Sequence, residues 1–354
     1  MSSPRYLILA EGRFGPLTSK TANSCIRYTP DNVVGVIDSE LAGKTAQDVL
    51  GFGGAIPVVA SVDSGLRLQP NALLIGVAPQ GGQLPPEWRA MVLAAIDAGL
   101  DIWSGLHTFI GDDAEFAAHA ARRGVTVHDL RKAPADLPVA TGRVRDVEAT
   151  VVLTVGTDCN IGKMTAALQV RDALRARGHA IRFAGTGQTG ILIEGWGIAV
   201  DSVIADFIAG ATEQLVLQAA EGADIVLVEG QGSLIHPGYS GVSLGLLHGS
   251  LPHAMVMCGQ PSRTTVNNNP WVPIPSLRDA IRLHETVLAV LRPAPVIAVS
   301  LNTFDLPEQA ARDAIARACA ETGLPTTDPV RFDPAPIADA IAAFHAGRHR
   351  KTPG

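Results

Sequence analysis

The sequence predicts two α/β domains with parallel sheets, and three observations support this prediction. The chain has 354 residues, which at about 150 residues per domain is enough for two separate cores. Hydrophobic residues make up 47% of the chain but aromatic residues only 5%, so Ala, Val, Leu, Ile and Gly carry the apolar content. Short β-branched runs alternate with stretches of helical spacing in both halves. Parallel strands packed on Ala-rich helices fit these observations, whereas an aromatic-rich β-sandwich does not.

In the first half, short apolar runs predict buried strands at residues 5–10, 33–37, 57–62 and 72–78. Helical spacing after an initial Pro or acidic residue predicts helices at residues 86–98 and 112–123. An alternation of strands and helices of this kind is typical of a small parallel sheet. The first domain is expected to span residues 1–145.

The domain boundary is expected where the periodicity stops. Residues 131–149 contain Pro, Asp, Gly and Arg without a helical or strand period. The alternation then restarts, with strands expected at 150–155, 181–184, 224–228, 254–257 and 296–301. Helices are expected at 162–177, 203–220, 277–291, 307–322 and 335–345. The second domain is therefore assigned to residues 146–350.

Charge and cysteine content exclude several classes of protein. The chain has 28 Lys and Arg against 34 Asp and Glu, and so offers no basic surface for a nucleic-acid backbone. Its 4 cysteines stand far apart without a C-x-x-C pair, which indicates reduced thiols rather than disulfides or a zinc site. The apolar run after Arg5 is too short for a signal-peptide core or a membrane span. We expect a soluble, cytoplasmic protein with neither a nucleic-acid nor a membrane partner.

The strongest local signal is the loop at residues 155–165, VGTDCNIGKMT, between a predicted strand and a predicted helix. In that position, backbone N–H groups and the positive end of the helix dipole face one concavity. Open α/β sheets bind ligands beyond the carboxyl ends of their strands, which is where this loop lies. The loop predicts a phosphate-binding cradle rather than an ordinary turn. Its candidate cofactor contacts are Gly156, Asp158, Asn160, Gly162, Lys163, Met164 and Thr165.

The cradle departs from a Walker A motif in two ways. Its first glycine stands one residue too far from Gly162, and Met164 follows Lys163 where a Ser or Thr hydroxyl would hold Mg²⁺. A thioether is a weak ligand for Mg²⁺, whereas Thr165 keeps a hydroxyl for a phosphate oxygen. The chain also has no Asn-Lys-x-Asp motif for reading guanine. We therefore expect the cradle to bind a phosphorylated cofactor without a metal, rather than to hydrolyse a γ-phosphate.

Candidate catalytic residues lie at 229–240, EGQGSLIHPGYS, after the strand expected at 224–228. His236 has a side chain that titrates near neutral pH, and Glu229 can orient it or accept a proton itself. The alternative is structural, with His236 in the turn before Pro237 and Glu229 capping the loop. The sequence is compatible with both the catalytic and the structural interpretation.

Other polar residues near the carboxyl ends of predicted strands have alternative roles. Residues 185–190, GTGQTG, contain three glycines in six positions, which favours a ligand loop with Gln188 as a cofactor contact. Asp201 and Asp206 lie near a predicted helix start, where one of them is expected to cap the helix; a catalytic role for Asp201 is the alternative. Cys159 either fills the cradle loop or, because a helix N-terminus lowers the pKa of a thiol, acts as a reactive nucleophile.

Cationic side chains for an acidic substrate follow the first strand. Lys20, Thr21, Asn23 and Arg27 combine charge with hydrogen-bonding groups, and Arg in particular binds a carboxylate through two hydrogen bonds. The alternative is a solvated helix face. Arg263, after the strand expected at 254–257, is a further candidate for a carboxylate or a phosphate.

Several stretches carry a resemblance that covers nearly the whole chain. They lie at residues 15–23 (GPLTSKTAN), 51–54 (GFGG), 105–109 (GLHTF), 156–165, 186–190 (TGQTG) and 229–237 (EGQGSLIHP). The cradle and the later Val228-Glu229-Gly230 look like the dethiobiotin synthetase branch of the P-loop proteins. More closely, the chain resembles a bacterial and archaeal family with an N-terminal Rossmann-like domain and a C-terminal P-loop NTPase-like domain. That family includes the D-glutamate N-acetyltransferases.

The resemblance implies acetyl-CoA as acetyl donor and an acidic amino acid, D-glutamate, as acceptor, in D-amino acid catabolism. CoA carries a diphosphate and a 3′-phosphate but no transferable γ-phosphoryl group, which suits a cradle that keeps Lys163 and lacks the metal hydroxyl. Two alternatives stay open: an ATP-dependent ligase or kinase resembling dethiobiotin synthetase, and a nucleotide-binding regulatory protein without turnover. An Ala- and Gly-rich chain with few aromatic residues is also expected to form a homo-oligomer.

Overall fold

The computed structural model describes residues 3–77 and 82–350. The chain forms two compact units, here called unit 1 (Met1–Ala133 with Ile191–Gly195) and unit 2 (Pro134–Gly190 with Trp196–Gly354). The division falls at 133–134, earlier than the expected boundary between 145 and 146. The intervening segment packs on unit 2, because the buried Glu213 carboxylate accepts hydrogen bonds from the backbone N–H groups of Thr141 (3.2 Å) and Arg143 (2.9 Å).

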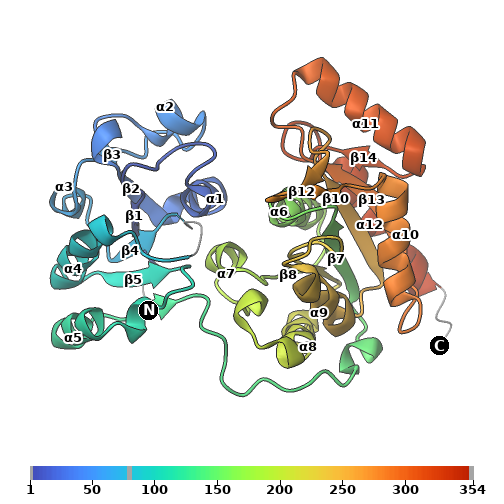
Figure 1. Cartoon of the computed structure of the whole chain (residues 1–354), viewed down its shortest axis with the longest axis horizontal. Helices are drawn as coiled ribbons and strands as arrows, with labels where there is room; N and C mark the ends of the chain where they lie inside the picture. The colour runs from blue at the N-terminus through green and yellow to red at the C-terminus, as the bar shows by residue number, and fades with distance from the viewer. Residues whose placement is uncertain (1–2, 78–81, 351–354) are drawn as a thin grey trace. The chain divides into compact units, whose positions relative to one another are not determined.

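Unit 1 is a parallel sheet with helices, as the alternation in the sequence predicts (Figure 1). Its strands are β1 (Tyr6–Leu9), β2 (Val33–Ile37), β3 (Val58–Val59), β4 (Ala72–Ile75), β5 (Asp101–Ser104) and β6 (Val127–Asp129). In the sheet they lie in the order β3-β2-β1-β4-β5-β6. Its helices are α1 (Lys20–Tyr28), α2 (Ala46–Leu50), α3 (Val62–Leu66), α4 (Arg89–Asp97) and α5 (Ala114–Arg123). Short 3₁₀ turns η1 (Pro30–Asn32), η2 (Ser39–Leu41), η3 (Pro86–Trp88) and η4 (Ile110–Asp112) complete it.

Unit 2 has its own parallel sheet, in the order β14-β13-β10-β7-β9-β8. The strands are β7 (Thr150–Gly156), β8 (Ile181–Ala184), β9 (Ile225–Val228), β10 (Ala254–Gly259), β13 (Val296–Leu301) and β14 (Thr326–Thr327), and β11 (Thr265–Val266) and β12 (Asn269–Pro273) form a separate antiparallel hairpin. The helices are α6 (Lys163–Arg175), α8 (Ile208–Ala220), α9 (Ser240–Ser250), α10 (Leu277–Leu288), α11 (Glu308–Thr322) and α12 (Ala335–Arg350). Helix α7 (Gln188–Glu194) starts in unit 2, and its residues from Ile191 onward belong to unit 1. The 3₁₀ turns are η5 (Arg143–Asp146), η6 (Val200–Ser202) and η7 (Ala205–Phe207).

The strand that leads into the cradle is buried on both faces of the sheet. Side chains alternate along β7, so Val151, Leu153 and Val155 join a core cluster with residues of α8, α9 and α10. Val152, on the opposite face, lines a small cavity with residues of α6 and α12. This two-sided burial explains the continuous apolar run in the sequence and fixes the carboxyl end of β7 firmly.

Sequence features at helix ends account for where several helices start and stop. The Asp113 side chain accepts hydrogen bonds from the backbone N–H groups of Glu115 and Phe116, and so caps the start of α5. Gly124 ends that helix in the left-handed conformation (φ 66°). The Ser276 hydroxyl accepts a hydrogen bond from the backbone N–H of Asp279 and so caps the start of α10.

Some expected elements differ from the observed ones. The helix expected at 203–220 begins only at Ile208, because Val200 N–H donates to the Thr186 carbonyl and the chain before Ile208 forms η6 and η7 instead. Neither Asp201 nor Asp206 caps α8, whose N-cap is Phe207. The strand expected at 72–78 ends as β4 at Ile75, and Ala78 lies outside the described residues.

Several short elements were not predicted from the sequence: α2, α3, β6, the β11–β12 hairpin, α9 and β14. Three glycines lower the helix propensity of α9, but two of them are needed for packing. A Cβ at Gly245 would lie 2.4 Å from Cγ2 of Ile208, and one at Gly249 would lie 2.2 Å from the Ala209 carbonyl oxygen. Helix α9 thus contacts α8 more closely than side chains would allow.

Within the described ranges, no helix has both the length and the apolar content needed to cross a membrane. Cys25, Cys159, Cys258 and Cys319 are all free thiols, as the sequence predicts.

Candidate functional site

The cradle lies between the carboxyl end of β7 and the start of α6. Gly162 (φ 98°) and Asn160 (φ 52°) have left-handed backbone conformations, which curl the loop over the first turn of the helix. Lys163 is only 6% exposed, and its Nζ donates to the Asp158 carbonyl oxygen at 2.6 Å. The loop therefore combines a buried ammonium with the positive end of a 13-residue helix, which is the electrostatic arrangement of an anion site.

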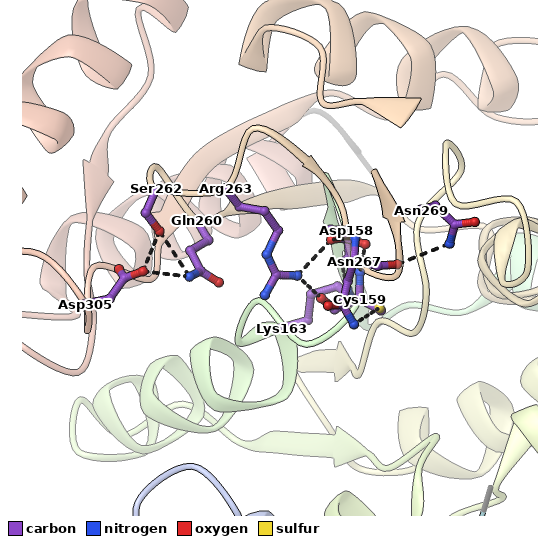
Figure 2. A network of polar contacts seen from close by, with 9 residues as sticks. All are labelled: Asp158, Cys159, Lys163, Gln260, Ser262, Arg263, Asn267, Asn269 and Asp305. Atoms are coloured by element: carbon purple, nitrogen blue, oxygen red, sulfur yellow. Dashed lines mark hydrogen bonds and ion pairs between the residues drawn. The ribbon is translucent and has the colours of Figure 1, made fainter. Parts of the chain in front are cut away.

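Asp158 links the cradle to the neighbouring hairpin. Its carboxylate is fully buried and accepts hydrogen bonds from the backbone N–H groups of Cys159 (2.7 Å) and Asn267 (2.7 Å). Nη1 of Arg263 donates to the same carboxylate at 2.8 Å and to the Cys159 carbonyl oxygen at 2.8 Å (Figure 2). A buried charge needs such partners, so these contacts give Asp158 a role in holding the loop.

Arg263 thus lies at the cradle, as its position after β10 predicts, but its guanidinium is bound to Asp158. Next to it, Nε2 of Gln260 donates to Asp305 (3.1 Å) and to the Ser262 hydroxyl (3.1 Å), as Figure 2 shows. Gln260, Asp305 and Asn267 were not predicted from the sequence as site residues. The run Asn267-Asn268-Asn269 could have indicated a turn at this place, because Asn tolerates the left-handed conformation that Asn268 adopts (φ 59°).

The end of β9 lies on the other side of β7. Oε2 of the buried Glu229 accepts hydrogen bonds from the backbone N–H groups of Thr186 (2.9 Å) and Gly187 (3.1 Å). Gly230 allows close contact with the cradle, because a Cβ there would lie 1.7 Å from the Thr154 carbonyl oxygen and 3.0 Å from Cδ of Lys163. The two loops that the sequence analysis assigned to ligand binding, at 185–190 and 229–240, therefore meet at Glu229.

Gln188 and Asp201 lie near these loops in the chain. Gln188 is half-buried at the first position of α7, so the stretch expected as a loop turns into a helix there. Asp201 is half-buried in η6.

His236 comes to the cradle from the loop after β9. It is 4% exposed, and its ring packs against the Tyr239 ring with centroids 4.4 Å apart. Nδ1 of His236 accepts a hydrogen bond from the backbone N–H of Gly238 at 3.1 Å. One of its ring nitrogens, Sγ of Cys159 and a carboxylate oxygen of Asp158 all lie within 4.8 Å of one another.

Two members of this group of three residues already accept hydrogen bonds. The Asp158 carboxylate already accepts hydrogen bonds from a guanidinium and from backbone N–H groups, and Nδ1 of His236 accepts one from Gly238. A metal ion would have to displace these donors while lying beside the cationic Arg263.

Cys159 is a less reactive thiol than its position at a helix N-terminus predicts. Burial, together with the carboxylate of Asp158, raises the pKa of the Cys159 thiol above its usual value. Of the two alternatives for Cys159, this pKa favours the one in which the side chain fills the loop, because desolvation outweighs the lowering effect of Lys163.

The candidate substrate residues of unit 1 lie on α1. Nδ2 of Asn23 donates to the carbonyl oxygens of Gly15 (2.9 Å) and Pro16 (3.1 Å), so its amide closes the loop before the helix. Thr21 is buried and Lys20 is exposed. The guanidinium of Arg27 is exposed above the Phe52 ring, 4.0 Å from its centroid. Lys20 and Arg27 are thus accessible cations, whereas Asn23 serves the fold of its own loop.

Comparisons with known proteins assign both halves of the chain. Residues 138–338 match the P-loop domain of the family described as domain of unknown function DUF1611, and residues 39–133 match its Rossmann-like N-terminal domain. The chain is 35% identical over 342 residues to a D-glutamate N-acetyltransferase of Tritonibacter scottomollicae, covering 96% of this chain and 98% of that protein. It is 33% identical to a D-glutamate N-acetyltransferase of Pseudoalteromonas sp, covering 93% and 96% respectively.

A solved structure agrees over the same extent. The crystal structure of a DUF1611 family protein from Anabaena variabilis shares 40% sequence identity with the chain and superposes with a TM-score of 0.91. The match covers 96% of this chain and 99% of that one. The predicted fold class, a Rossmann-like and a P-loop α/β domain, is confirmed.

Proposed function

The chain belongs to the DUF1611 family, and from this premise we propose that it is an N-acetyltransferase that moves acetyl from acetyl-CoA to the α-amine of D-glutamate. The observation that carries the proposal is the match to two proteins named D-glutamate N-acetyltransferase, at 33% and 35% identity over nearly the whole chain. The likeness is not confined to the cradle, so it includes the segments that would select the acceptor.

The structure of the cradle supports CoA as the phosphate-bearing partner. Met164 is buried and offers only a thioether, so the usual hydroxyl for Mg²⁺ is missing directly after Lys163. Lys163 and the start of α6 still provide positive charge for a diphosphate. Thr165 is half-buried and adds a hydroxyl. A cofactor with phosphates but no phosphoryl transfer suits this combination.

The proposed reaction is a direct displacement. The neutral amine of the acceptor attacks the thioester carbon, the new C–N bond forms, and the C–S bond breaks with CoA thiolate as leaving group. The proton lost by the amine finally protonates that thiolate, so an amide and a free thiol result. Glu229 is our proposed proton acceptor, since the N–H groups of Thr186 and Gly187 fix the orientation of its carboxylate.

The acceptor carries two carboxylates, which need cationic partners. We assign them to Lys20 and Arg27 of α1, because both are exposed, whereas Arg263 is bound to Asp158.

The experiment that tests the proposal is release of free thiol from acetyl-CoA with D-glutamate or L-glutamate as acceptor. We expect release that depends on D-glutamate, with N-acetylglutamate identified by mass spectrometry and a mixture without acceptor as blank. No thiol release with any acidic amino acid would overturn the proposal. Mg²⁺-dependent ADP release in a parallel assay with ATP would favour a ligase or kinase instead.

A further inference from the structure

The proton on the His236 ring has a position fixed by the backbone. The N–H group of Gly238 donates to Nδ1 at 3.1 Å, and a backbone N–H is always a donor. Nδ1 must therefore be the acceptor, and in the neutral ring the proton is on Nε2. The nitrogen that His236 can offer to a ligand is thus an N–H donor, not a lone pair that accepts a proton.

The loop around His236 keeps the ring in this state. The backbone N–H of His236 donates to the Ser233 carbonyl oxygen (3.1 Å), and the N–H of Ser240 donates to the His236 carbonyl oxygen (3.0 Å). The Tyr239 ring packs against the imidazole at 4.4 Å. Turning the ring over would break the bond from Gly238, so one orientation is favoured.

The same ring lies at the cradle. Its titratable neighbours there are Asp158 and Cys159 of the loop after β7, with which it shares the 4.8 Å cluster, and Tyr239 from its own segment. The negative charge of Asp158 is paired with Arg263, and Lys163 donates to the carbonyl oxygen of the same residue, so an N–H donor on His236 lies in a loop that also holds two cations.

We propose that His236 is a phosphate-binding residue, whose Nε2–H donates to a phosphate oxygen held in the cradle, and not the proton acceptor of the reaction. The proposal rests on the proposed function only in that the phosphate is the diphosphate of CoA. A nucleotide diphosphate has the same chemistry, and the test separates the two sources.

The length of CoA supports the same assignment. About thirteen bonds separate the diphosphate from the thioester sulfur, roughly 15 Å in an extended chain. A ring that contacts a diphosphate in the cradle is then remote from the thioester carbon. His236 can serve one end of the cofactor, and its neighbours Asp158 and Cys159 place it at the phosphate end.

The first test measures binding by calorimetry with CoA, ADP, inorganic pyrophosphate and acetyl-pantetheine, which has no phosphate. We expect His236→Ala to weaken CoA binding roughly 10- to 100-fold, the effect of losing a hydrogen bond to a charged group. His236→Gln, whose amide keeps an N–H donor, should recover most of this affinity. The matched control His349→Gln changes an exposed histidine at the end of α12 and should not alter CoA affinity.

The probes identify the source of the phosphate. Equal weakening of CoA, ADP and pyrophosphate supports a shared diphosphate site, and preferential weakening of CoA identifies its diphosphate as the natural occupant. Unchanged affinity of the Ala variant for every phosphate-bearing probe, or an equal loss for acetyl-pantetheine, would overturn the proposal.

The second test separates a donor from a base. If His236 binds phosphate, the KM for acetyl-CoA rises more than kcat falls, and the acidic limb of the pH profile persists in His236→Ala. A kcat loss of about 10²–10⁴-fold, with that limb gone and KM unchanged, is the signature of a general base and would contradict us.

The tautomer itself is measurable without activity. Nitrogen NMR of the full chain with ¹⁵N-labelled histidine should show the His236 ring protonated at Nε2 near pH 7.5, assigned by comparison with His236→Gln. A ring protonated at Nδ1 would overturn the proposal. Absence of thiol release with any acceptor would overturn the proposed function alone, because the tautomer and the binding of pyrophosphate do not depend on it.

Discussion

The two units begin in the same way, with a buried strand, a loop containing glycine and a helix, yet their loops use polar residues differently. In unit 1, the loop between β1 and α1 uses Asn23 and Ser19 to bind its own carbonyl groups at Gly15. In unit 2, the loop between β7 and α6 buries Lys163 and Asp158 and gathers His236 from another segment. Lysine, threonine, asparagine and glycine occur in both segments when the first turn of the following helix is included, so composition does not distinguish them.

This difference shows which polar groups are available to a ligand. A polar group that satisfies the hydrogen bonds of its own loop stabilises the loop and offers little to a ligand. Charged groups that are buried together carry a cost of desolvation, which the chain tolerates where a ligand or a partner compensates for it. Of the two loops, the cradle of unit 2 buries Lys163 and Asp158 in this way.

The largest expected effect is on the reaction. Glu229→Gln keeps the shape of the side chain but removes the base, so kcat for thiol release should fall about 10²–10⁴-fold with little change in CoA affinity. The exposed Glu221→Gln is the matched control. A Glu229→Gln variant with unchanged kcat would place the proton acceptor elsewhere.

The buried carboxylates of the two units should differ in their effect on stability. Asp158→Ala leaves Arg263 without its partner and should lower the free energy of unfolding by about 3 kcal/mol. Asp38→Ala in unit 1 removes an acceptor for the neutral N–H groups of Phe14 and Glu40 and should cost about 1–2 kcal/mol.

Urea unfolding followed by hydrogen-exchange mass spectrometry reports on each unit separately. Equal losses in the two variants would show that the charge of Arg263 has no part in the difference.

Acid should destabilise unit 2 through its buried histidines. Burial lowers the pKa of His284 to about 4, below the usual 6.5. As the pH falls through 6.5, the unfolded chain therefore takes up a proton that the folded chain binds only near pH 4. Stability is lost across this window, by roughly 3 kcal/mol at most. His253, with a pKa lowered to about 3 by burial, acts in the same direction.

His284→Asn tests this, because its amide can still donate to the Ala280 carbonyl that Nδ1 of His284 contacts. We expect its urea midpoint to vary less between pH 6.5 and 4 than that of the wild-type chain. The same pH dependence in both proteins would show that His284 does not cause it.

The smallest expected effects are on ligand binding, when a lysine is removed from one or the other of the two segments. Lys163→Ala should weaken CoA binding roughly 10- to 100-fold, because it removes a charged donor from the cradle. Lys20→Ala in unit 1 should leave CoA affinity unchanged but raise the KM for D-glutamate. Calorimetry with CoA and steady-state kinetics check both. Unchanged CoA affinity after loss of Lys163 would move the phosphate site out of the cradle.

The position of the cradle was predictable because it depends on residues that are close together in the sequence. The apolar run of β7, the glycine loop after it and the helical spacing of α6 place the cradle correctly from sequence alone. Strand β6 was missed because its short segment, VHD, contains polar residues that obscure a strand period. Helix α9 was missed because its glycines serve a contact with α8 that the sequence does not reveal.

The sequence by itself determined the two α/β domains, the position of the cradle and the absence of a metal-binding hydroxyl after Lys163. The tertiary structure alone decided that Arg263 binds Asp158, 105 residues earlier in the chain, and that His236 lies beside Cys159. The physical reason is the strand order, in which β10 and β9 lie on either side of β7. Their carboxyl ends bring Arg263 and His236 to the cradle, and no local pattern in the chain specifies which strands become neighbours.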